Sequence, residues 1–361
     1  MRSRHLILSF IFLFFTFELF ACKTPVYKYA LKKWGRDVYD IVKIYDSKKS
    51  NGRLNPKMEK AVLDMVKISS NGTSLTNVRL WPVDINGDIK KRFGDEVYKY
   101  YKNQLEYQKP PFYIIFNPKR KPIYCGEFSE KDIPNLMLSP AREKLINALA
   151  TQKVVFMLIA SSNAEKNEAA KKILDESIKE GIKEELIVRK RRVKDLNDEE
   201  KKFKPLEIIY VTIDPNDDKE EWFKRQLIGI SDEIKDDDEP KVFGVVGKGY
   251  VFEKCLTKET LTNKDIIDHI IFLTGPCSCT VKKDNKGMDI ITGWDWGKTV
   301  DLLPDVDDGE ETKIAGFGGE EIEEESNKKN ENGYLKIVLS LIIVIGVGVL
   351  LMNKLLKPKD K

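Results

Sequence analysis

The chain has 361 residues, enough to bury a substantial core in one large domain or in two domains of roughly 100–150 residues each. Its composition, with 41% hydrophobic and 10% aromatic residues, excludes disorder over most of the length. The 62 basic and 58 acidic side chains nearly balance, to a net charge of +4, so the charge does not indicate nucleic acid as a main partner.

Residues 1–21 have the organisation of a secretory signal peptide. Arg2 and Arg4 precede an apolar stretch from residue 6 to residue 17, which is the order of charged and hydrophobic residues in an export signal. The next residues, Leu19-Phe20-Ala21-Cys22, resemble a bacterial lipobox, in which Cys22 would carry a lipid and begin the mature protein. An uncleaved N-terminal anchor, and ordinary cleavage that leaves Cys22 as a free thiol, are the alternatives.

From residue 22 to residue 150 the sequence predicts a first unit with the order strand, helix, strand, helix, strand, strand, helix. The strands are expected at Val38 to Tyr45, Val78 to Ile85, Phe112 to Phe116 and Ile123 to Phe128. The helices are expected at Asn55 to Ile68, Lys90 to Tyr107 and Asp132 to Ala150, with an interruption at Ser139-Pro140.

The same order recurs from residue 151 to residue 280, which indicates an internal duplication. Here the strands are expected at Val154 to Ala160, Leu206 to Ile213, Val242 to Val246 and Tyr250 to Cys255. The helices are expected at Asn163 to Gly181, Glu220 to Ile230 and Asn263 to Leu273. Strands joined through a helix run parallel and those of a hairpin antiparallel, so each unit is expected to be a small mixed α/β sheet covered on both faces.

The C-terminal part of the chain has the pattern of a membrane anchor. Residues 281–333 are predicted to be a tail leading into an acidic, flexible stalk, and residues 334–356 are apolar enough and long enough to cross a bilayer. A buried core helix is a weaker interpretation, because only a short basic end, residues 357–361, follows. Lysines follow the apolar stretch and glutamates precede it, so the C-terminus is expected in the cytoplasm and the bulk of the chain outside the cell membrane.

The order of the elements resembles that of the thioredoxin fold, and the chain resembles tandem thioredoxin-like domains at residues 22–150 and 151–280. The resemblance implies a cis-proline before the hairpin strand of each unit, at Pro111 and Pro240. Residues 22–31 and 273–279 further resemble uncharacterised bacterial envelope proteins and lipoproteins. This resemblance implies a fold and a location in the cell envelope, but little chemistry.

The cysteines that thioredoxin-type catalysis needs are missing from the expected positions. Such an enzyme places a Cys-X-X-Cys pair after the first strand, where the helix N-terminus stabilises the thiolate. The corresponding segments, Asp46 to Ser50 and Ser161 to Glu165, contain no cysteine, so disulfide exchange cannot run there. Zinc is disfavoured, because no suitably spaced cysteine pair exists and His269, expected in an apolar helix, is the one histidine outside the signal. We therefore predict no catalytic residue, metal or cofactor.

Four cysteines follow Cys22, namely Cys125, Cys255, Cys277 and Cys279, and an exported protein can form disulfides. A disulfide between Cys277 and Cys279 would close a small strained ring with an oxidising potential. Alternatively, one of the two bonds to Cys255 and holds the tail in place. The sequence leaves both interpretations open.

Trp294 and Trp296 lie close together in the tail, where they either contact a partner or fold back on the second unit. The function favoured by the sequence is a membrane-anchored, extracytoplasmic binding or scaffold protein that contacts another envelope protein through non-catalytic domains. The rival hypotheses are a thiol-disulfide protein acting through Cys277 and Cys279, and an accessory subunit of an envelope transport complex.

Overall fold

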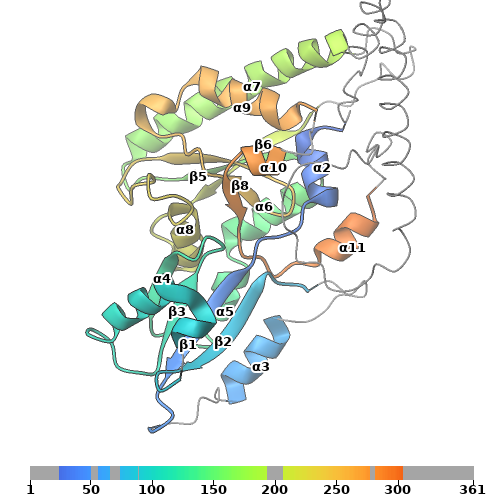
Figure 1. The fold of residues 1–361 in the computed structure, drawn as a ribbon. Coiled ribbons are helices and arrows are strands. Elements are labelled where there is room, and N and C mark those ends of the chain that lie inside the picture. The colour runs from blue at the N-terminus through green and yellow to red at the C-terminus, as the bar shows by residue number, and fades with distance from the viewer. Residues whose placement is uncertain are drawn as a thin grey trace, which may run out of the picture. The chain divides into compact units, whose positions relative to one another are not determined.

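The computed structural model describes residues 24–49, 56–65, 74–87, 89–192, 206–276 and 281–303 (Figure 1). They belong to one compact unit that covers residues 1–310. The predicted signal peptide, Cys22, the acidic stalk, the predicted membrane helix and the basic end lie outside the described residues. Among the described residues, no helix is both long enough and apolar enough to span a bilayer.

The first sheet has four strands in the order β2-β1-β3-β4. They are β1 (Tyr39–Tyr45), β2 (Val78–Asp84), β3 (Phe112–Phe116) and β4 (Pro122–Gly126). β1 and β2 run parallel with Tyr39 opposite Val78, and helix α3 (Pro56–Met65) lies between them in the chain. β3 runs antiparallel to β1 with Ile115 opposite Ile41, and β4 completes a hairpin with β3.

The second sheet has five strands in the order β6-β5-β7-β8-β9. They are β5 (Val154–Ile159), β6 (Ile208–Ile213), β7 (Lys241–Val246), β8 (Tyr250–Phe252) and β9 (Gly287–Asp289). Helix α7 (Ala164–Arg192) links the parallel pair β5 and β6, while β7 is antiparallel to β5 and β8 to β7. The predicted mixed α/β organisation, with two mixed sheets flanked by helices, is confirmed.

The structure adds elements that the sequence did not predict, before the first sheet and after the last predicted helix. β9 comes from the tail and pairs antiparallel with β8. The short helices α2 (Val26–Lys33), α10 (Val281–Asp284) and α11 (Trp296–Asp301) were not predicted either. Pro25 forms an isolated bridge with Pro276, next to α2. The segment before the first sheet therefore lies against the segment that follows helix α9 (Asn263–Thr274), in the second half of the chain.

One hydrophobic cluster takes in residues of both sheets, including Ile41 of β1 and Met157 of β5. Helices α5 (Ile133–Met137), α6 (Pro140–Ala150) and α8 (Glu221–Ile228) contribute to the same cluster. The alternate residues of the strands, such as Phe156 of β5, are buried on the opposite face of the sheet. Because the central strands are buried on both faces, they appear in the sequence as continuous apolar runs.

The opposite faces of the two sheets are covered by separate helices (Figure 1). α4 (Ile89–Gln104) covers the first sheet through Val97 and Tyr101. α7 and α9 (Asn263–Thr274) cover the second sheet. One face of each sheet therefore packs against helices that cover that sheet alone, and the other face contributes to the hydrophobic cluster that both sheets share.

A buried arginine also links the helices of the two sheets. Arg142 of α6 is fully buried and donates to the carbonyl oxygens of Asn135 and Leu136 and to Oε1 of Gln226 on α8. Its guanidinium carbon lies 4.6 Å from the ring centroid of Phe223. Burial lowers the pKa of Arg142 to about 9, and the nearby charge of Glu220 opposes that shift.

Glu220, directly before α8, is the acidic counterpart of this arginine and is 3% exposed. Its carboxylate accepts hydrogen bonds from Oγ of Ser139 at 2.5 Å and from the amide of Ala141 at 2.6 Å. Ser139 is the N-cap of α6, and its hydroxyl also accepts from the amide of Arg142. The N-terminus of α6 is thus hydrogen-bonded to Glu220, which lies in the part of the chain that forms the second sheet.

Candidate functional site

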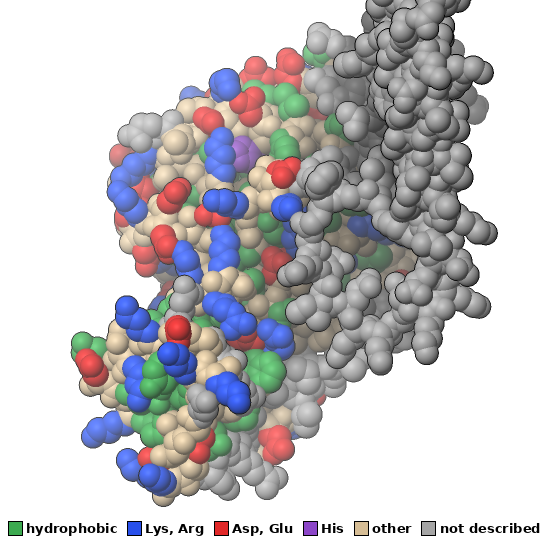
Figure 2. Space-filling view, in the orientation of Figure 1, with side chains coloured by type: hydrophobic (Ala, Val, Ile, Leu, Met, Phe, Trp, Pro, Cys, Tyr) green, Lys and Arg blue, Asp and Glu red, His purple; other side chains and the backbone are tan. Residues whose placement is uncertain are grey.

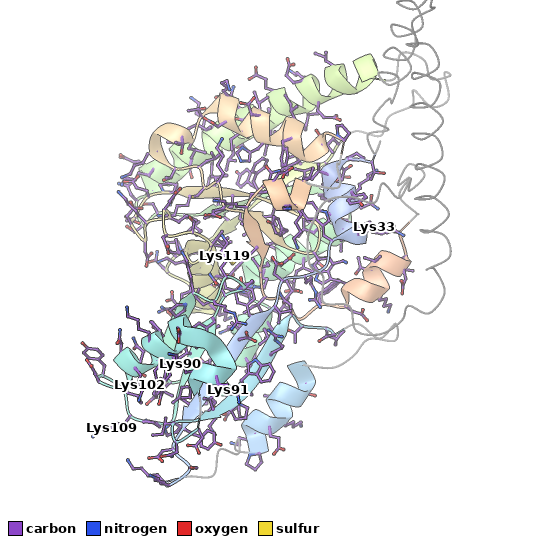
Figure 3. The ribbon with its side chains drawn as sticks, viewed as in Figure 1. Lys33, Lys90, Lys91, Lys102, Lys109 and Lys119 are labelled. Carbon is purple, nitrogen blue, oxygen red and sulfur yellow. The ribbon has the colours of Figure 1, made fainter. Side chains whose placement is uncertain are left out.

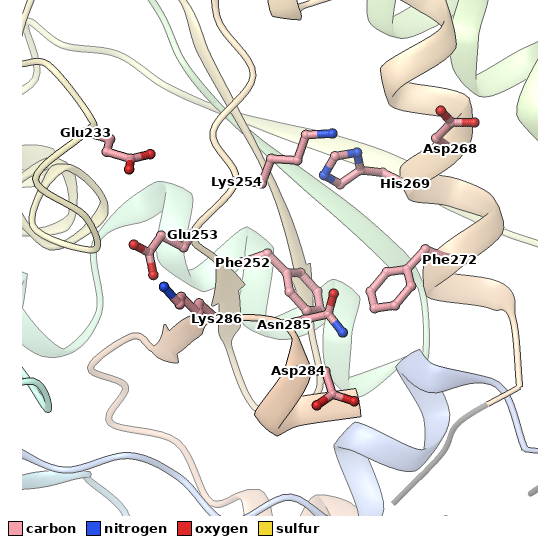
Figure 4. A pocket seen from close by; sticks show the side chains of 10 residues that line it. All are labelled: Glu233, Phe252, Glu253, Lys254, Asp268, His269, Phe272, Asp284, Asn285 and Lys286. Atoms are coloured by element: carbon pink, nitrogen blue, oxygen red, sulfur yellow. The ribbon is translucent and has the colours of Figure 1, made fainter. Parts of the chain in front are cut away.

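A cavity of about 490 Å³ lies beside β8 and α9, within the size range of small-ligand pockets. Figure 4 shows Phe252 of β8 and Phe272 of α9 on its wall, with His269 one turn from Phe272. The charged residues that line it are Glu233, Glu253, Lys254, Asp268, Asp284 and Lys286. The cavity therefore combines an aromatic wall with a rim that carries both signs of charge.

The aromatic wall is fixed by contacts between rings. The ring centroids of Phe252 and Phe272 are 5.5 Å apart with an interplanar angle of 79°, the edge-to-face arrangement that aromatic pairs prefer. Tyr250 packs edge-to-face on Phe252 from the other side, at 5.4 Å. At Gly244 of β7, an added Cβ would lie 3.5 Å from Cδ2 of His269. These contacts hold the apolar surface in one shape.

His269 is bonded to the backbone of its own helix and also lines the cavity. Its Nδ1 lies 2.8 Å from the carbonyl oxygen of Asp265, and that bond requires a proton on Nδ1, which leaves Nε2 as an acceptor. Burial lowers the pKa of the imidazole, so the ring is neutral at pH 7. The sequence predicted the structural role of this histidine but not its place in a cavity.

Three of the six charged residues on the rim pair with other residues of the protein. Glu253 pairs with Lys119 at 2.7 Å, Lys254 with Asp265 at 3.5 Å, and Asp268 with Lys264 at 2.6 Å. None of the described residues that line the cavity is a serine, threonine or cysteine. The arrangement is suited to binding through apolar, hydrogen-bonding and charged contacts.

In the second sheet, the residues after β5, where the thioredoxin resemblance would place a Cys-X-X-Cys pair, include serines that bond to an aspartate. The amide and hydroxyl of Ser162 donate to the two carboxylate oxygens of Asp238, both at 2.6 Å. The hydroxyl of Ser161 donates to the carbonyl oxygen of Asp238 at 3.0 Å. The hydrogen bonds from Ser162 hold the pKa of Asp238 below its ordinary value. These hydrogen bonds join the loop before β7 to the residues just before α7, at an exposed position.

In the first sheet, Asp46 after β1 is joined through an asparagine to Asp84 at the end of β2. Nδ2 of Asn86 donates to Oδ1 of Asp46 and to Oδ1 of Asp84, each at 2.9 Å. Hydrogen bonds from Ser47 lower the pKa of Asp84 to about 2. Among the described residues, no group of three or more histidine, cysteine, aspartate or glutamate side chains could hold a metal ion. Turn hydrogen bonds therefore account for these acidic residues.

Cys125 and Cys255 are free thiols in the described part of the chain. Burial raises the pKa of Cys125 to about 11, and burial raises that of Cys255 to about 12. Both thiols are therefore almost fully protonated at neutral pH and are poor nucleophiles. Cys277 and Cys279 lie outside the described residues, so the small disulfide ring and the bridge to Cys255 both stay predictions.

The thioredoxin resemblance implies a cis peptide bond before Pro111 and before Pro240, but the two bonds differ in conformation. The peptide bond between Pro110 and Pro111 is cis, whereas Pro240 has no cis bond before it, so the expectation is wrong at the second position. The trans form is the lower-energy state of a bond before proline. The preceding loop is held by Nζ of Lys241, which donates to the carbonyl oxygens of Asp237 at 2.7 Å and Glu239 at 3.0 Å.

The two tail tryptophans pack on the protein to different extents. Trp296 is 3% exposed, and its Nε1 donates to Oγ1 of Thr292 at 3.0 Å. Trp294 is half-buried, and its Nε1 donates to Oγ1 of Thr299 at 2.9 Å. Back-packing, one of the two predicted alternatives, therefore describes Trp296, which is not accessible to a partner.

A buried charged cluster that the sequence did not reveal links the start of β1 to β9. The amide of Asp37 donates to Oδ2 of Asp289 at 3.0 Å, and the amide of Asp289 donates to Oδ2 of Asp37 at 3.1 Å. Lys282 lies 3.2 Å from Oδ2 of Asp289 and 3.4 Å from Oδ1 of Asp37. Burial raises the pKa of Asp289 to about 6. These contacts attach the tail, through β9 and Lys282, to the residue Asp37 just before β1.

The chain matches no protein-family model, and no curated protein matches it. Its function is therefore argued from the residues and contacts described above.

Proposed function

We propose that this chain is a membrane-anchored, extracytoplasmic binding protein built from two non-catalytic thioredoxin-like domains. The observation that carries this proposal is the contact between Ser162 and Asp238, at the position where a thioredoxin-type enzyme needs a reactive cysteine. A serine hydroxyl contains no sulfur and cannot exchange disulfides, so this position does not support the chemistry of a thioredoxin-type enzyme. A retained scaffold without its thiols supports a role in binding.

The sheet topology supports the thioredoxin-like assignment in both halves. In each half a helix crossover joins a parallel pair of strands and an antiparallel hairpin follows, which is the order expected from the resemblance. Membrane attachment rests on the sequence patterns at residues 1–22 and 334–356. The cavity beside β8 and α9 supplies a surface on which a small ligand, or a side chain of an envelope protein, would bind.

Site-specific photo-crosslinking in living cells tests the binding role. A photoreactive residue replaces Lys254 or Lys286 on the cavity rim, and the matched control places it at Lys172, which is exposed on α7. We expect a discrete cross-linked product from the two rim positions and none from the control. If the rim positions give no cross-linked product, or if all three positions give the same product, the proposal of binding at this cavity is rejected.

Membrane attachment is tested separately, by fractionation and protease access. The chain should stay in the membrane pellet after alkaline carbonate extraction, and protease added to spheroplasts should digest the bulk of it. Release by carbonate, or protection of the whole chain from external protease, would contradict the anchored, extracytoplasmic assignment.

A further inference from the structure

One region of the chain, residues 90–121, carries a marked excess of positive charge. Residues 90–121 contain nine basic and three acidic side chains, a net charge of +6, which exceeds the +4 of the entire chain. The rest of the protein is therefore slightly acidic. A local excess of this size produces a positive potential over one part of the surface.

Five lysines of this region form an exposed surface on α4 and the loop that follows it, which we call the basic face. The basic face consists of Lys90, Lys91, Lys99, Lys102 and Lys109. Figure 3 labels four of them, gathered around α4, and Figure 2 shows basic side chains in the same region. Lys119 does not belong to it, because its Nζ is bonded to Glu253 and to the carbonyl oxygen of Ile230.

Among the described residues, few carboxylates pair with the lysines of the basic face. Lys90 pairs with Asp95 at 2.9 Å, on an exposed part of the helix, where such pairs contribute little. Glu106 is the other exposed acidic side chain of α4 and the following loop whose position is described. Within the described part of the chain, Lys99, Lys102 and Lys109 form no ion pair with a carboxylate, so these three charges face water, mobile ions or an anionic partner.

Tyrosines lie among the lysines of the basic face. Tyr107 is 80% exposed, and Nζ of Lys102 lies 5.5 Å from the ring centroid of the half-buried Tyr98. Tyrosine places an apolar ring and a polar hydroxyl at one depth, and lysine extends a charged group past an apolar stem. Both residue types suit the boundary between lipid headgroups and acyl chains.

We propose that the basic face lies on the anionic lipid headgroups of the membrane to which the chain is attached. This inference rests on the proposed membrane anchoring, which keeps the described part of the chain close to a lipid surface. Each lysine near an anionic bilayer strengthens binding by about fivefold. The five lysines therefore orient the described part with α4 toward the membrane.

Amine labelling of the full-length chain tests the proposal without altering it. The protein is reconstituted into phosphatidylcholine vesicles with or without phosphatidylglycerol, treated with a water-soluble amine reagent, and analysed by peptide mass spectrometry. The labelling of Lys99, Lys102 and Lys109 should fall several-fold with the anionic lipid and recover at high salt. Three exposed lysines of α7 serve as the internal control and should not change, namely Lys172, Lys179 and Lys183.

Two matched variants distinguish lipid contact through the basic face from a nonspecific electrostatic attraction of the whole protein to the bilayer. K99Q/K102Q/K109Q removes three charges and should weaken lipid contact by about a hundredfold, so the protection of Lys91 is lost. K172Q/K179Q/K183Q removes three charges from α7, where acidic side chains are interspersed, and should leave that protection intact. Equal circular dichroism spectra and melting temperatures establish that both variants are folded.

Equal labelling with and without anionic lipid would overturn the proposal. Protection that persists in detergent without lipid, and disappears when the acidic residues of 305–325 are neutralised, would also overturn it, because the chain's own stalk would then cover the face. Protection by anionic lipid in a chain that alkaline carbonate releases would sustain the lipid contact while contradicting the membrane helix.

Discussion

Replacing Glu220 with alanine tests whether buried charges hold the helices of the two sheets together. The substitution removes the carboxylate whose charge favours the protonated form of the buried Arg142, and it leaves the amide of Ala141 and the hydroxyl of Ser139 without their acceptor. Removing one partner of a buried charge network costs about 3–5 kcal/mol. For a protein of this size, we expect the melting temperature to fall by roughly 6–20 °C.

The neighbouring residue provides the matched control for this experiment. Glu221 pairs with Arg225 at 2.7 Å on the surface, where both side chains are 44% exposed, and a surface pair contributes about 0–1 kcal/mol. Chemical denaturation of the full-length chain in detergent, followed by tryptophan fluorescence, measures both variants. If E220A and E221A lower the free energy of unfolding equally, the buried network does not stabilise the protein and the reasoning is wrong.

Three further predictions follow from the tail and the free cysteines. Gly287→Ala should destabilise β9 by about 1–3 kcal/mol, because the new Cβ would lie 2.3 Å from the carbonyl oxygen of Val251, and hydrogen exchange of the tail amides should rise. Asp289 has a folded-state pKa raised by burial to about 6, above its unfolded value of about 3.9, so its protonation favours the folded state. Urea unfolding should therefore show stability increasing by about 1 kcal/mol from pH 7 to pH 5, and D289N should lack that part of the increase. Native alkylation at pH 8 should modify Cys125 and Cys255 far more slowly than alkylation in denaturant, because burial raises the pKa of both thiols; equal rates would contradict their burial.

The sequence predicted the elements whose patterns are local and strong. β3 was predicted with the bounds that the structure has, Phe112–Phe116, because five consecutive apolar residues after a proline pair are typical of a doubly buried strand. The interruption between α5 and α6 at Ser139-Pro140 was predicted from N-cap and proline preferences. β9 was missed, because Gly287–Asp289 is short and contains neither a β-branched nor an aromatic residue.

The sites could not be predicted as readily as the elements, since they depend on distant residues. The cavity joins β8 and α9 to the tail after α10, and no local pattern marks the tail residues as part of a pocket. Asp37 and Asp289 contact each other across 252 residues of chain, and each alone resembles an ordinary surface aspartate. Burial and pairing of polar groups come from tertiary structure, which composition and periodicity do not encode.

The contacts between the two halves of the chain bear on how the proposed non-catalytic scaffold would bind a partner. Besides the shared cluster, Nδ2 of Asn117 donates to the carbonyl oxygen of Gly229 at 2.9 Å, and Lys119 pairs with Glu253, which lines the cavity. The first sheet therefore contacts the cavity rim of the second sheet directly. A binding surface supported in this way loses little conformational entropy when a partner binds, and that favours affinity. For this reason the first half of the chain contributes to the proposed binding role even though the cavity itself belongs to the second.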